Sequence, residues 1–107
     1  MDNQLVDQLY NRAVQMHVAR EQLKAWGTDV NNPTSRKTMK QLQKNVKKAE
    51  RNTQKAIQSI LDSQGIGFYE ENATSRQVKD LIANLLERAQ KDAVEKKFWQ
   101  IVNVSVI

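Results

Sequence analysis

Residues 34–63 read TSRKTMKQLQKNVKKAERNTQKAIQSILDS, and they carry the strongest helical pattern in the chain. Their apolar and small side chains recur at intervals of three and four, which is the spacing of one face of an α-helix. Thr34 or Ser35 can cap the start of such a helix. The segment therefore predicts a long amphipathic helix whose buried stripe is Met39, Leu42, Val46, Ala49, Thr53, Ala56 and Ile60.

Two more helical patterns flank this segment, and turn residues separate the three. Residues from about 3 to 26 repeat apolar side chains at the same spacing, and Gly27 follows as a stop signal. After a loop at 65–73, a predicted capping box from Thr74 to Gln77 opens a third helix, from about 74 to about 98. The tail 99–107 is rich in β-branched residues, so we expect it to be extended or folded back over the helices. The 107 residues are thus predicted to form one all-α domain.

The first two predicted helices favour an antiparallel helical hairpin, because both have heptad-like spacing and only the turn 27–33 separates them. The first helix also carries a second apolar group, Val14, Val18 and Trp26, on another side. One further helix does not cover all the apolar edge of so long a hairpin. We therefore expect a homodimer in which two hairpins form an antiparallel four-helix bundle, with a monomeric three-helix bundle as the rival.

The positive charge of the chain is concentrated in the second predicted helix. The chain has 17 Lys and Arg against 12 Asp and Glu, a net charge of +5. Residues 34–63 hold eight basic groups against Glu50 and Asp62, which gives +6 for this segment alone. At about 100° per residue, the eight fall within an arc of about 120°, nearly opposite the buried stripe. This basic face consists of Arg36, Lys37, Lys40, Lys44, Lys47, Lys48, Arg51 and Lys55, with Gln41, Asn45 and Asn52 along its edge.

The pattern of the basic face favours an anionic partner. Like charges recur four residues apart, as in Lys40–Lys44 and Arg51–Lys55, although a solvated face usually mixes signs at that spacing. A membrane surface would need the apolar side of the helix free, and a DNA reader usually has a short recognition helix. A single-strand binder uses aromatic side chains, which this face lacks. What remains is a duplex recognised by its shape and its phosphates, over a face about 28 Å long. For an RNA duplex this means phosphates together with the 2′-hydroxyls of the minor groove.

Composition argues against several other classes. Zero Cys and one His speak against thiol chemistry and a metal site, and no Gly-rich phosphate loop is present. We expect no enzyme activity, no cofactor and no small-molecule substrate. The absence of 18 consecutive apolar residues predicts a soluble intracellular chain with no membrane partner. His17 is expected to be packed or half-exposed, and Arg20 either to lie at a bundle edge or to reach a phosphate.

Several details of residues 29–61 occur together: an Asn-Asn turn at 31–32, the basic pair Arg36-Lys37, Lys48-Ala49 in mid-helix, and Lys55 ahead of Ile57. With these features the segment resembles the central helix of the insect nodavirus suppressors of RNA silencing, the small dsRNA-binding B proteins. The length of the chain, the hairpin partner and the shorter third helix fit the same family. Two features depart from it: Lys stands at 55 where the family pattern has Arg, and the apolar tail has no counterpart.

The resemblance implies an all-α homodimer that binds double-stranded RNA without sequence preference in the host cytoplasm. It implies suppression of RNA silencing by shielding the RNA from host Dicer, which is also a candidate partner. Lys37, Lys48 and Lys55 match basic contact positions of the family, and Asn45 and Asn52 match small polar ones. The alternative, from another functional class, is a small helical adaptor or regulator that docks an acidic protein through the same basic face.

Overall fold

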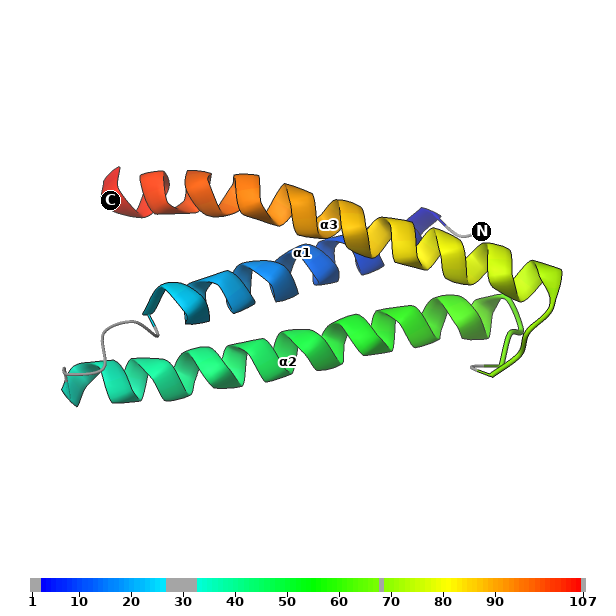
Figure 1. The fold of residues 1–107 in the computed structure, drawn as a ribbon, viewed down its shortest axis with the longest axis horizontal. Coiled ribbons are helices and arrows are strands. Elements are labelled where there is room, and N and C mark those ends of the chain that lie inside the picture. The colour runs from blue at the N-terminus through cyan, green and yellow to red at the C-terminus, as the bar shows by residue number, and fades with distance from the viewer. Residues whose placement is uncertain (1–2, 27–32, 68, 107) are drawn as a thin grey trace.

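The computed structural model describes residues 3–26, 33–67 and 69–106, with the side chains of 26, 33–35 and 96–106 outside the description. It contains three helices, α1 (Asn3–Trp26), α2 (Pro33–Ser63) and α3 (Ala73–Val106), which confirms the all-α prediction. The molecule is elongated, with extents of 52 × 26 × 18 Å (Figure 1). Residues 27–32 of the predicted turn at 27–33, among them Asn31-Asn32, lie outside the described residues, and Pro33 already belongs to α2.

Helix α1 is the central element of the fold, because it packs against both α2 and α3 (Figure 1). The ribbon shows that α2 runs antiparallel to α1, as expected for a helical hairpin, and that α3 returns parallel to α1. The predicted hairpin is therefore found within one chain.

The apolar core consists of two clusters that follow one another along α1. The first joins all three helices near the start of α1 and consists of Leu9, Ala56, Ile60, Leu61, Ile66, Val78 and Ile82. The second joins only α1 and α3 and consists of Ala13, Val14, Val18, Ala89 and Ala93. Three of these five are alanines, so the axes of α1 and α3 can approach closely in this second cluster. We call it the alanine seam.

The second apolar group of α1 is covered within its own chain. Val14 and Val18 are buried against α3 in the alanine seam. Helix α3 thus supplies the cover that we expect from a second copy on sequence grounds. The side chain of Trp26, its third member, lies outside the described residues.

One polar side chain lies in the buried stripe of α2. Thr53 is only 3% exposed. Its hydroxyl oxygen lies within hydrogen-bond distance of two carbonyl oxygens, that of Ala49 at 2.8 Å and that of Arg12 at 3.2 Å. The first bond is the usual return of a helical threonine to its own backbone. The second crosses to α1 and fixes how far α1 is shifted along α2.

Helix α2 ends, and α3 begins, at two local motifs between residues 61 and 75. Gly65 has a φ of 65°, and the N–H groups of Gly65 and Ile66 bond the carbonyls of Asp62 and Leu61, which is a Schellman ending. The predicted capping box at Thr74–Gln77 is wrong by two residues. Asn72 and Ser75 form it, because Asn72 Oδ1 accepts from Ser75 N at 2.8 Å and Ser75 Oγ accepts from Asn72 N at 2.9 Å.

The predicted end of the third helix near residue 98 is also wrong. Helix α3 continues to Val106, so residues 99–106 are neither extended nor folded back over the bundle. No Gly or Pro occurs between residues 73 and 106. The helix penalty of β-branched residues is only about 0.5 kcal/mol each, too small to end a helix without a stop signal.

Candidate nucleic-acid interface

All eight side chains of the basic face are exposed to solvent along α2. Within the described residues, no ion pair involves any of them. On the opposite side of the helix, the stripe predicted from spacing faces the core: Val46, Thr53, Ala56 and Ile60 are buried, and Met39, Leu42 and Ala49 are half-buried. Helix α2 therefore exposes its cations to solvent, and none of them forms an ion pair with a described carboxylate.

The amide side chains at the edge of the basic face differ in exposure. Asn45 is exposed and accepts a hydrogen bond of 3.0 Å from Gln41 Nε2, one turn earlier. Asn52 is half-buried at the boundary with α1. The structure thus brings all ten residues predicted for the site onto one helix, with the cations outward and the two asparagines at the margin.

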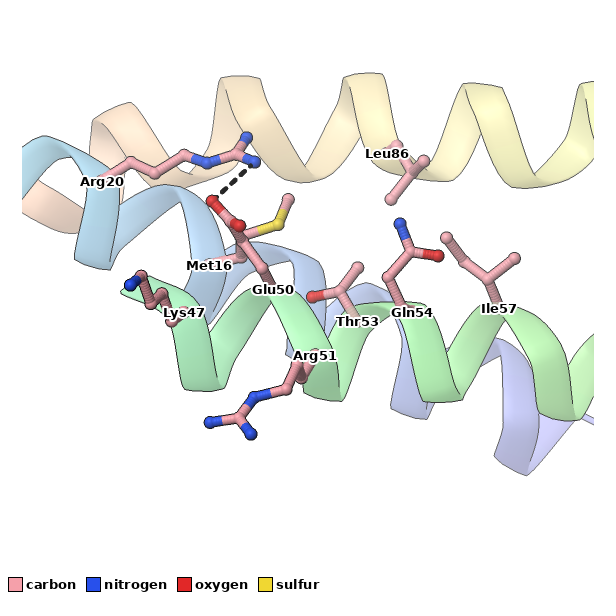
Figure 2. Close-up of a pocket in the computed structure, with 9 residues that line it drawn as sticks. All are labelled: Met16, Arg20, Lys47, Glu50, Arg51, Thr53, Gln54, Ile57 and Leu86. Atoms are coloured by element: carbon pink, nitrogen blue, oxygen red, sulfur yellow. Dashed lines mark hydrogen bonds and ion pairs between the residues drawn. The ribbon is translucent and has the colours of Figure 1, made fainter. Parts of the chain in front are cut away.

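Glu50 is the one acidic residue of α2 before Asp62. Its carboxylate does not pair with the neighbouring cations of the basic face but with Arg20 of α1, at 3.3 Å between Oε1 and Nη2 (Figure 2). Both side chains are 44% exposed, so Arg20 lies at a bundle edge and still reaches solvent. Because the pair cancels its own charge, the basic face keeps its full positive field.

A groove opens between α2 and α3, with α1 as its floor. Apolar side chains line its inner part, among them Met16, Ile57 and Leu86, while Arg20 and Glu50 lie at its rim (Figure 2). The Arg51 guanidinium points away from Glu50 in the same view. A second hollow continues the groove past Ile57 and Leu86, and it adds Leu61, Lys79, Ile82 and Ala83.

The described part of the chain contains no cluster of metal-ligating side chains. None of its His, Asp and Glu side chains gather in groups of three or more that could hold a metal ion. His17 is half-buried, and burial lowers its pKa, an effect that the nearby Arg20 charge increases. A neutral, packed imidazole fits a structural role.

A feature that the sequence analysis missed lies on α1. Five amide side chains, Gln4, Gln8, Asn11, Gln15 and Gln22, are all exposed and recur at helical spacing. We call them the amide row. The signal that would have found it is the spacing of polar amides, which a search for apolar stripes and charges passes over.

Comparison of the chain with protein-family models, with curated protein sequences and with solved structures gives no match. In the described residues, no helix has an apolar stretch of the length needed to cross a bilayer. Functional assignment therefore rests on the arrangement of the side chains themselves.

Proposed function

We propose that the protein binds double-stranded RNA without sequence preference through the basic face of α2. We further propose that it suppresses host RNA silencing by shielding the duplex from Dicer. The observation that carries the proposal is a single helical face with eight exposed cations and no ion pair among the described residues. Repeated like-charge pairs destabilise an isolated helix, and an anionic duplex removes that repulsion.

The shape of the face favours a duplex over other anions. From Arg36 to Lys55 it is about 28 Å long at 1.5 Å per residue, and it is continuous because it lies on one helix. No aromatic side chain interrupts it, so it has no platform for stacking unpaired bases. Asn45 and Asn52 at its edge can donate to and accept from sugar hydroxyls, which duplex RNA has and DNA lacks.

We propose further that the protein acts as a homodimer, as an antiparallel four-helix bundle of two hairpins. With Val14 and Val18 covered by α3, support for the dimer comes from the groove between α2 and α3. Apolar side chains such as Ile57 and Leu86 line this groove, and a second copy would remove them from water. Light scattering tests this directly, because the chain mass is 12.3 kDa and a dimer has twice that value. A monomer at the concentrations that bind RNA would contradict it.

A gel-shift competition between double-stranded RNA, single-stranded RNA and double-stranded DNA tests the binding proposal. We expect double-stranded RNA to compete best, with an affinity that falls steeply as salt rises through counterion release. Lys48→Glu and Lys55→Glu should abolish binding with helicity intact. The matched control is Arg76→Glu, the same charge reversal on an exposed residue of α3. Equal affinity for RNA and DNA duplexes would mean an unspecific polycation.

The proposal about silencing needs a second assay. Purified protein added to long double-stranded RNA should slow its cleavage by Dicer in proportion to the fraction of RNA bound, and Lys48→Glu should remove the protection. A pull-down from host lysate with and without nuclease adds a check. If the protein has no affinity for RNA and forms a stoichiometric protein complex that survives nuclease, the basic face docks an acidic protein and the RNA proposal is wrong.

A further inference from the structure

The amide row of α1 is unusual for a solvated helix face because it carries no charge. Gln4, Gln8, Asn11 and Gln15 follow one another at intervals of four, three and four residues, and Gln22 lies on the same side. More than a quarter of the chain is charged, at 27%, and exposed helical positions usually take such residues. The row from Gln4 to Gln15 is about 17 Å long at helical rise.

The packing of α1 on α2 sets the middle of the amide row level with Asn52, at the edge of the basic face. Val14 and Val18 turn toward α3, and the carbonyl of Arg12 meets Thr53 of α2. That contact brings the turn from Asn11 to Gln15 level with Asn52. The amide row itself is exposed, so neither α2 nor α3 covers this side of α1.

The surface there is also hollowed. A shallow depression on α1 is lined by Gln4, Asp7, Gln8, Asn11, Arg12 and Gln15. Five of these six side chains can donate hydrogen bonds, and four are amides that both donate and accept. A ribose 2′-hydroxyl is likewise both donor and acceptor, and such hydroxyls line the shallow minor groove of an RNA duplex.

We propose that the amide row of α1 is a second part of the RNA interface, which contacts 2′-hydroxyls in the minor groove and makes the protein prefer RNA to DNA duplexes. The inference rests on the proposed function, because it assigns the phosphates to the basic face of α2. In this arrangement the cations of α2 supply affinity for any duplex, and the neutral amides of α1 discriminate RNA duplexes from DNA duplexes.

The test is a triple variant, Gln8→Ala, Asn11→Ala and Gln15→Ala, compared with Gln77→Ala, Asn84→Ala and Gln90→Ala on exposed positions of α3. Alanine is the best helix former, so neither variant should lose helicity. We expect the α1 variant to bind double-stranded RNA about tenfold or more weakly, and double-stranded DNA within about twofold of the parent. The α3 variant should match the parent on both duplexes.

The salt dependence separates this interface from the phosphate contacts. Neutral amides release no counterions, so the α1 variant should keep the parent slope of log affinity against log salt, whereas Lys48→Glu should make that slope less steep.

A duplex of the same length built from 2′-deoxynucleotides tests the sugar contacts. The parent protein should bind it more weakly than the ribose duplex, and the α1 variant should bind the two duplexes alike.

Three results would overturn the inference: an α1 variant that behaves as the α3 variant, equal losses on RNA and DNA, or a reduced salt slope. If instead the parent protein binds no duplex RNA, the proposed function itself is wrong and the inference goes with it. The parent measurement therefore distinguishes the two failures.

Discussion

Tyr10 of α1 contacts Asp92 of α3 through its hydroxyl group. Its hydroxyl donates a hydrogen bond to Asp92, and this bond raises the pKa of Tyr10, as do burial and the Asp92 charge. Removing the hydroxyl leaves the carboxylate without its donor. We expect Tyr10→Phe to lower the free energy of unfolding by about 1 kcal/mol in urea titrations. Tyr69→Phe, at a side chain 89% exposed, is the control and should cost much less. Equal losses would show that the Tyr10 bond contributes nothing specific.

His17 makes stability depend on pH in a defined direction. Burial, and then the charge of Arg20, lower its folded pKa below the ordinary value of 6.5. Protons therefore bind the unfolded chain more readily, and stability falls as pH drops below that value. His17→Gln removes the part of this acid-induced loss of stability that protonation of His17 causes. Denaturation midpoints at about pH 7.5 and about pH 5.5 should lie closer together in the variant than in the parent. If the difference between the two midpoints is the same in the variant and the parent, the loss of stability at low pH comes from carboxylates and not from His17.

At the scale of the helix, α3 depends on the Asn72 cap. Asn72→Ala removes the acceptor for Ser75 N and should cost about 1 kcal/mol of stability, measured by thermal unfolding. Asn84→Ala is the matched change at an exposed position inside α3. It should be neutral or slightly stabilising, because alanine favours the helix. A cap variant as stable as Asn84→Ala would mean that the motif does not hold the start of α3.

The helices also show how far sequence reasoning reaches. The spacing in α2 is unbroken from Met39 to Ile60, so both the helix and the exposure of its basic side chains could be predicted. The end of α3 could not, because branched residues disfavour a helix too weakly to stop it. The partner of Val14 and Val18 was missed for a different reason: spacing shows that a side chain needs cover but not which element supplies it. The spacing of the amide row is visible in the sequence, but its position level with Asn52 depends on how α1 packs on α2.

At the scale of the whole molecule, the like charges of the basic face repel one another and lower the stability of the free protein. Lys44 lies one turn from both Lys40 and Lys48. Lys44→Glu turns two repulsions into two attractions, so it should stabilise the free protein by about 0.5 kcal/mol in chemical denaturation. The same variant should bind double-stranded RNA more weakly in gel shifts. Stability and binding that fall together would show that the charge of this face serves the fold rather than a ligand.

The alanine seam between α1 and α3 tolerates fewer substitutions than the outer face of α2. Ala13, Ala89 and Ala93 are each 0% exposed, so a larger residue at any of them has to push α3 off α1. The outer face of α2 is exposed to solvent, so it accommodates larger side chains. In a saturation mutagenesis screen, abundance of the folded protein would report on one surface and capture of nucleic acid on the other, with little overlap between the two maps.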